Sequence, residues 1–169
     1  LLRPQDRAEL AELHPTDHRI LLDRFRGSKR IRVRNEDGLA LMRARLPPPE
    51  RRAVVLIDPS WEVKSEYETV PQALIDAYRR FPQGVYILWY PVIERARSEA
   101  VIETLRTAAI PRRYRLELGM LPDGAARGMT GCGLVLINPP WTFPQAVAEG
   151  LPWLAERLGA TGPVTAGWL

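Results

Sequence analysis

Three acidic side chains lie where short apolar or alternating segments end: Glu12, Asp37 and Asp58. In sheets of parallel strands, ligands bind beyond the carboxyl ends of the strands. A carboxylate at Glu12 is suited to accept hydrogen bonds from ribose hydroxyls. One at Asp37 is suited to accept from the exocyclic amine of a base, and the neighbouring Gly38 lets a base approach the backbone. The alternative is that each acid caps the helix that follows it.

The third acid begins a short turn, Asp58-Pro59-Ser60-Trp61, whose residue types suit methylation of an adenine amine. That amine is a poor nucleophile, because its lone pair is delocalised into the ring. If Asp58 and the carbonyl of Pro59 accept its two N–H groups, the lone pair can attack the methyl group of S-adenosylmethionine. Ser60 would then contact the substrate, and Trp61 would stack on the flipped base. The alternative is a strand-ending Asp-Pro turn with a packed tryptophan.

A second turn, Asn138-Pro139-Pro140-Trp141, fits the amino-methyltransferase signature (Asp/Asn)-Pro-Pro-aromatic better as a string. Its place in the chain argues against catalysis. Residue 138 comes three expected strands after Asp58, so we expect it near the sheet edge opposite the cofactor. We therefore interpret 138–141 as a structural turn.

Basic residues are concentrated near the start of the chain. Residues 1–58 carry 13 basic and 9 acidic side chains, which accounts for the whole net charge of +4. The densest stretch is 19–34, and a basic face of this kind is typical of nucleic-acid binding. The alternative is a solvated helix and turn. The candidate substrate contacts in this stretch are Arg24, Arg26, Lys29 and Arg30.

Composition excludes several classes of protein. The chain has 169 residues, 46% of them apolar and 26% charged, which indicates one globular domain over residues 1–169. No stretch approaches the ~20 apolar residues of a membrane span. The single cysteine, Cys132, excludes an internal disulfide and is expected to be a small buried residue, and two histidines exclude a histidine-rich zinc site. We expect a cytoplasmic monomer with no metal and no membrane partner.

Strands and helices are expected to alternate along most of the chain, which predicts an α/β fold with a mostly parallel sheet and helices on both faces. The expected strands cover 8–13, 31–34, 53–57, 84–90, 114–121 and 133–137, with a short extended tail at 164–169. The expected helices cover 17–26, 39–45, 70–81, 94–108 and 144–158.

A series of short strings, in order along nearly the whole chain, resembles the RlmJ family, the 23S ribosomal RNA adenine-N6 methyltransferases. The strings at 89–91 (Trp-Tyr-Pro) and 127–130 (Arg-Gly-Met-Thr) are the most distinctive. The others are Glu12-Leu13-His14-Pro15, Asp37-Gly38, Leu46-Pro47-Pro48, Leu56-Ile57-Asp58-Pro59, Glu62, Leu121-Pro122-Asp123, Ile137-Asn138-Pro139-Pro140-Trp141 and Leu151-Pro152-Trp153-Leu154.

The resemblance implies a Rossmann-like methyltransferase that uses S-adenosylmethionine and acts on RNA of the large ribosomal subunit. By position, Glu12 would hold the cofactor ribose, and Asp37 with Gly38 would meet the cofactor adenine. Asp58 and the carbonyl of Pro59 would hold the target amine, and Trp61 would stack on the target base.

The chain departs from the family in two respects. The family turn is Asp-Pro-Pro-Tyr, where this chain has Ser60 and Trp61; we expect weaker positioning of the amine. The family also has an N-terminal portion with the first, central strand and its Gly-containing cofactor loop. We expect the sheet to lack that strand, which would lie between the strands that end at Glu12 and Asp58. The chain therefore resembles the C-terminal part of the enzyme.

Two other functions stay open from the sequence. One is a non-catalytic remnant that binds nucleic acid through the basic stretch 19–34. The other, suggested by older descriptions of the same family, is a role in the use of external DNA as a nutrient. Methyl transfer predicts that replacing Asp58 abolishes activity, whereas a binding remnant predicts that substitutions at Arg24 and Arg26 lower affinity.

Overall fold

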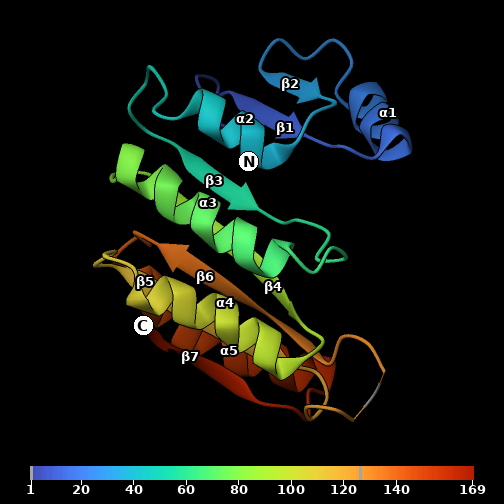
Figure 1. Ribbon diagram of the computed structural model, residues 1–169, viewed down its shortest axis with the longest axis vertical. Coiled ribbons are helices and arrows are strands. Elements are labelled where there is room, and N and C mark those ends of the chain that lie inside the picture. Colours follow the sequence, from blue (N-terminus) through green and yellow to red (C-terminus); the bar gives the residue numbers. More distant parts are fainter. Residues whose placement is uncertain (1, 126) are drawn as a thin grey trace. The chain divides into compact units, whose positions relative to one another are not determined.

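The computed structural model describes residues 2–125 and 127–169 (Figure 1). The chain divides into two compact units, Leu1–Leu46 and Pro47–Leu169. Each unit has its own strands and helices, and each carries part of the residues singled out above.

The first unit is a two-stranded parallel sheet with two helices. Its elements are β1 (Ala8–Ala11), α1 (Pro15–Arg24), β2 (Ile31–Arg34) and α2 (Gly38–Arg45). Ala8 pairs with Ile31 and Ala11 with Arg34, so the two strands end together. Parallel strands need a crossover connection, and α1 with its flanking turns supplies it. The residues that follow β1 and β2 therefore lie at the same end of this sheet.

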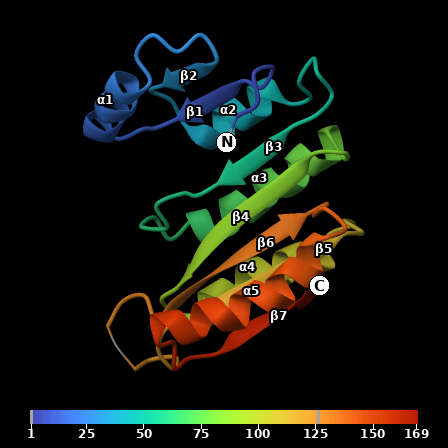
Figure 2. The same ribbon diagram turned by 180° about the vertical axis from the view of Figure 1, so that it is seen from behind.

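The second unit is a five-stranded sheet with helices on both faces. Its elements are β3 (Val54–Ile57), α3 (Glu66–Arg80), β4 (Val85–Val92), α4 (Arg95–Thr107), β5 (Arg113–Gly119), β6 (Gly131–Ile137), α5 (Phe143–Leu158) and β7 (Val164–Trp168). The strand order is β3-β4-β6-β5-β7. Figure 1 shows α3 and α4 on one face of the sheet, and Figure 2 shows α5 on the other.

The prediction of a mostly parallel sheet is wrong for this unit. Only β3 and β4 pair in parallel, whereas β4 with β6, β5 with β6, and β5 with β7 pair antiparallel. The physical reason is the connection after β5. Residues 120–130 contain no helix in the part that the structure describes, and without a crossover helix the chain returns antiparallel. β6 thereby enters between β4 and β5, which run in the same direction.

The core of the second unit lies between the sheet and its helices. Tyr86, Leu88 and Tyr90 alternate along β4 and are fully buried, as expected for one face of a strand. On the opposite face, Tyr114 and Leu118 of β5 pack with Val147 and Leu151 of α5. This packing fixes β4 rigidly, and β4 holds β3 through their four paired residues.

Helix α3 begins at Glu66, four residues before the expected start at Val70. Proline is common in the first turn of a helix, but Pro71 lies five residues after this start. The structure instead carries the helix through Pro71, whose ring is buried together with Val70 and Leu74. Burial of this apolar face outweighs the backbone hydrogen bond that the proline cannot make.

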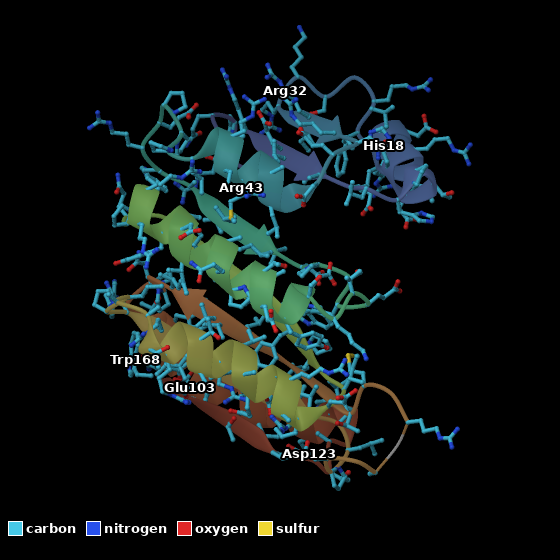
Figure 3. All side chains as sticks on the ribbon, viewed as in Figure 1. His18, Arg32, Arg43, Glu103, Asp123 and Trp168 are labelled. Carbon is cyan, nitrogen blue, oxygen red and sulfur yellow. The ribbon has the colours of Figure 1, made fainter. Side chains whose placement is uncertain are left out.

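A buried ionic network joins β4, β5 and α4. Glu117 of β5, only 2% exposed, accepts hydrogen bonds from the hydroxyl of Tyr90 (2.9 Å), from Arg95 (2.7 Å) and from Arg115 (2.7 Å). Arg95 also binds both carboxylate oxygens of Asp123, at 2.7 and 2.9 Å. Figure 3 labels Asp123 in the loop after β5. The network therefore ties this loop to α4 and to the interior of the sheet.

Candidate active site

The structure brings Glu12, Asp37 and Gly38 together at the carboxyl end of the β1–β2 sheet. Glu12 directly follows β1, and its backbone N–H donates to the carbonyl of Arg34, the last residue of β2 (3.0 Å). A Cβ atom placed on Gly38 would lie 3.7 Å from Cβ of Ala11, the last residue of β1. These three residues are therefore neighbours, as the sequence predicts.

Asn35 holds this end of the sheet together, and sequence reasoning missed it. Its side-chain amide donates to the backbone carbonyls of Glu12 (2.8 Å) and Leu13 (3.1 Å). These two bonds fix the strand end that carries Glu12 against the turn that carries Asp37. The available signal was an amide side chain directly after an alternating strand.

The helix-capping alternative is confirmed for Asp37. Its Oδ1 accepts a hydrogen bond from the backbone N–H of Leu39 (2.9 Å) at the start of α2. Glu12 behaves similarly, because its Oε1 accepts from the backbone N–H of His14 (2.7 Å), the residue that precedes α1. In each case only one carboxylate oxygen is used within the described residues. Capping and ligand binding are therefore compatible: the cap orients the carboxylate and the second oxygen is left to accept.

Asp58 differs from the other two acids. It follows β3, and α3 begins only at Glu66, so it caps no helix. Among the residues that the structure describes, no hydrogen bond or ion pair reaches its carboxylate. Desolvation by the surrounding protein raises the pKa of Asp58 above its ordinary value. An acceptor that is unpartnered and partly desolvated is suited to bind a donor group and to take up a proton.

The turn after Asp58 is strained, and its aromatic residue is packed. Trp61 has φ of 57°, a conformation that costs a bulky residue of order 1–3 kcal/mol. Its side chain is only 4% exposed and lies against Tyr67, with ring centroids 4.9 Å apart. Its indole Nε1 is buried without a hydrogen-bond partner in the described residues. This packing agrees with the alternative for Trp61, a packed tryptophan in a strand-ending turn.

Ser60 is exposed, and its hydroxyl lies 3.3 Å from Oε2 of Glu66 at the start of α3. It also accepts a long hydrogen bond from the backbone N–H of Glu62 (3.4 Å). Ser60 therefore links the turn to the helix that follows. Pro59 is half-buried between Asp58 and Ser60.

The rival turn at 138–141 has a structural role. β6 runs antiparallel to β4, and Ile137 pairs with Tyr86 near the start of β4. Asp58 follows Ile57, which pairs with Leu88 farther along β4, so the two turns lie at opposite ends of the sheet. Asn138, with φ of 54°, donates to the carbonyls of Pro82 (2.7 Å) and Gly84 (2.9 Å).

Two details of the sequence interpretation need correction. β6, which ends at Ile137, lies between β4 and β5 and is not at the sheet edge. Cys132, predicted to be buried, is partly exposed on β6. The 138–141 turn lies at the end of the sheet opposite Asp58 because β6 runs antiparallel to β4. The sequence did not indicate this direction.

The basic candidates of the first unit fall into two groups. Arg26 pairs with Asp23 at 2.9 Å, and Arg30 donates to the carbonyl of Arg3 at 2.6 Å. Arg24 and Lys29 make no such contact within the described residues. Arg32, labelled on β2 in Figure 3, is likewise exposed and without a partner in the described part of the chain. It lies in the basic stretch 19–34 but was not among the expected substrate contacts. The alternation of Arg with Ile and Val in 31–34 was the signal.

Membrane-spanning helices and metal-ligating clusters are both absent among the described residues. None of the helices they form is both long enough and apolar enough to cross a membrane. No group of three or more His, Cys, Asp or Glu side chains among them is placed to hold a metal ion.

The sequence matches a family model described as ribosomal RNA large subunit methyltransferase D, RlmJ, over residues 1–169. The chain belongs to this family. Its RlmJ relatives include proteins named ribosomal RNA large subunit methyltransferase J from Escherichia coli and Haemophilus influenzae, which are 42% and 43% identical to it over 171 residues. These alignments cover the whole chain and 61% of each relative.

A solved structure supports the fold. A crystal structure of a Legionella pneumophila protein superposes with a TM-score of 0.87 at 39% identity. The match covers 99% of this chain and 61% of that one. The chain therefore spans about three fifths of the length of its RlmJ relatives, with the mixed α/β architecture seen in that relative.

Proposed function

We propose that this chain takes part in methyl transfer from S-adenosylmethionine to the N6 amine of an adenine in large-subunit ribosomal RNA. Membership of the RlmJ family supports this class of reaction. The observation that carries the proposal is Asp58, the one strand-end acid of the three whose carboxylate is left without a partner in the described residues. A cytoplasmic location, where ribosomes are assembled, follows from this substrate.

The cofactor fits the carboxyl end of the β1–β2 sheet. Oε2 of Glu12 and Oδ2 of Asp37 make no hydrogen bond within the described residues, because each carboxylate uses only its other oxygen. Such acceptors suit the ribose hydroxyls and the exocyclic amine of an adenosine. Gly38 has no side chain to hold the base away. When bound, S-adenosylmethionine supplies an electrophilic methyl group on a positively charged sulfur.

Asp58 and Pro59 act on the target amine. The carboxylate of Asp58 and the backbone carbonyl of Pro59 accept its two N–H groups, which localises the nitrogen lone pair and directs it outward. The new N–C bond would form as the bond between the methyl group and sulfur breaks, with a neutral thioether as the leaving group, and the amine must lose one proton. Asp58 already accepts that N–H, and its raised pKa favours holding the proton.

The neighbouring residues support the turn. Ser60 links it to Glu66 of α3, and Trp61 anchors it through Tyr67. A stacking role for Trp61 on the target base requires its ring to leave this buried position, which would give the indole N–H access to a partner. Exposed Arg24 and Lys29, with Arg26 and Arg30, supply positive charge for the phosphates of the RNA.

The first experiment on this proposal measures binding of S-adenosylmethionine by calorimetry. Asp37→Ser keeps a helix-capping hydroxyl but removes the second oxygen, so α2 remains capped. Loss of a hydrogen bond to a charged group costs about 1.5–3 kcal/mol, and we expect affinity to fall roughly 10- to 150-fold. Asp76→Ser on α3 is the matched control and should bind as the unchanged chain does.

Two results would count against the cofactor assignment. One is equal affinity of the Asp37→Ser and Asp76→Ser variants. The other is a folded chain that shows no saturable binding at all. A purely nucleic-acid-binding function, the second candidate, is favoured by the exposed cations of the first unit and predicts that RNA still binds in the latter case.

A further inference from the structure

The first unit has a hollow between the end of α1 and β2 whose apolar part has no role in the proposed reaction. Its volume is about 510 Å³, within the range of about 300–1,000 Å³ that small ligands occupy. All the residues that line it belong to the first unit. Leu22, Phe25 and Ile31 form its apolar part, and Ser28, Arg26 and Arg32 form its polar part.

We propose that this hollow binds an unstacked nucleotide of single-stranded RNA, at a site separate from the adenine that is methylated. The inference rests on the proposed function in one respect, that the partner is RNA. It adds a second contact with the RNA, and it requires the RNA to be single-stranded where this contact is made.

The apolar part of the hollow suits the face of a base. Leu22 is 49% exposed, so much of its apolar surface is accessible beside the hollow. Phe25 is half-buried, so part of its ring is accessible. Aromatic and apolar side chains of this kind bind bases that have left their stack, whereas bases inside a duplex are covered by their neighbours.

The charge around the hollow suits a phosphate. Arg32 of β2 lines it and has no ion pair within the described residues, and Lys29 lies in the turn that borders it without a partner there. Two other cations of the lining are paired, Arg26 with Asp23 at 2.9 Å and Arg34 with Glu9 at 2.9 Å. Arg32 is therefore the cation best placed for a phosphate group.

The turn between α1 and β2 leaves the hollow open. Gly27 has φ of +80°, and a Cβ atom added there would meet nothing within 4 Å. Ser28 stabilises the turn, because its Oγ accepts from the backbone N–H groups of Arg30 (3.3 Å) and Ile31 (3.2 Å). Figure 3 labels His18 on α1 and Arg32 on β2, the two elements that border the hollow.

The test uses fluorescence anisotropy with three probes of equal length: an unstructured single-stranded RNA, an RNA duplex and a single-stranded DNA. Phe25→Leu keeps an apolar side chain but removes the aromatic face. Since base–aromatic stacking contributes about 1–3 kcal/mol, we expect at least about a 5-fold loss of affinity for single-stranded RNA. Affinity for the duplex should not change.

Arg32→Gln gives an independent readout that does not depend on the packing of Phe25. Each phosphate contact on a single strand contributes about 0.7 to the slope of log affinity against log salt concentration, so the slope should fall by about that amount. Arg79→Gln, on the exposed end of α3, is the matched control and should leave the slope unchanged.

The proposal is overturned if Phe25→Leu and Arg32→Gln bind single-stranded RNA as the control does. It is also overturned if duplex RNA binds at this site as tightly as single-stranded RNA. Single-stranded DNA offers the same base faces and phosphates and should show the same losses in both variants. The inference is distinguished from the proposed function because binding of single-stranded RNA, and its loss in Phe25→Leu, are measured without any methyl transfer. If methyl transfer fails while Phe25→Leu still lowers affinity and Arg32→Gln still lowers the salt slope, only the proposed reaction is contradicted.

Discussion

Replacing Asp58 with asparagine is expected to lower the rate of methyl transfer roughly 10²- to 10⁴-fold, the usual contribution of a positioned acid–base group. Asparagine preserves the size of the side chain and one oxygen acceptor but cannot hold the proton that the amine releases. Folding should be unaffected, within about 0.5 kcal/mol, because the carboxylate is exposed and makes no hydrogen bond in the described residues. The measurement is a single-turnover rate compared with a thermal unfolding curve.

The pH dependence of the same rate provides a control. Protonation turns the carboxylate from an acceptor into a donor, so activity should fall as the pH drops through the pKa of Asp58. Because desolvation raises that pKa, the acidic limb should lie above the ordinary aspartate value of about 3.9. Asp76→Asn should change neither rate nor profile. An Asp58→Asn variant that retains the full rate would contradict the assignment.

Replacing Glu117 with alanine is expected to destabilise the second unit by about 3–5 kcal/mol, the cost of breaking a buried ion pair by removing one partner. Glu117 is 2% exposed and accepts from Tyr90, Arg95 and Arg115. Its removal leaves both guanidinium groups without their buried carboxylate. The measurement is the midpoint of urea unfolding together with the slope of the transition.

Glu103→Ala is the matched control for this effect. Glu103 is an exposed acid on α4 that pairs with Arg106 one turn away, and such surface pairs contribute about 0–1 kcal/mol. Glu117→Gln, which keeps an acceptor for the Tyr90 hydroxyl, should lie between the two. If Glu117→Ala unfolds at the same urea concentration as Glu103→Ala, the network does not stabilise the sheet.

Most of the secondary structure is predictable from local patterns. The continuous apolar runs at 53–57 and 133–137 correspond to β3 and β6, and the helical spacing of Val101, Ile102 and Leu105 correctly indicates α4. These signals are local because burial on one face repeats with the period of the element itself. Errors are confined to ends, as at α3, where burial outweighs the effect of Pro71.

The direction of the strands is not predictable in the same way. The apolar run at 133–137 does not show whether the strand is parallel or antiparallel to its neighbours. A strand that is buried on both faces has the same apolar pattern in either direction. The only clue is the short Gly-containing connection before it, which leaves no room for a crossover helix. The buried ionic network is similarly hidden, since its partners are distant in sequence and their alignment depends on the register of β5 with β6.

The sequence predicts which residues lie together in the candidate site, but not the hydrogen bonds and packing of their side chains. The strand ends place Glu12 beside Asp37, as expected from two parallel strands. That Asp37 also caps α2, and that Trp61 is packed on Tyr67, depends on backbone angles that residue types leave open. Asn35 was missed because its role depends on side-chain hydrogen bonds to the backbone carbonyls of Glu12 and Leu13, which only the fold brings close. Arg32 lay in the predicted basic stretch 19–34, but its place beside the hollow depends on the fold.

The most direct test of methyl transfer identifies the product atom. The chain, joined to the part of the Escherichia coli relative that it does not match, is incubated with labelled S-adenosylmethionine and unmethylated large-subunit ribosomal RNA, and the nucleosides are separated. We expect label in N6-methyladenosine, and loss of that label with Asp58→Asn. Label on a ribose, a ring nitrogen or another base would contradict the account, as would no label from a folded protein that binds the cofactor.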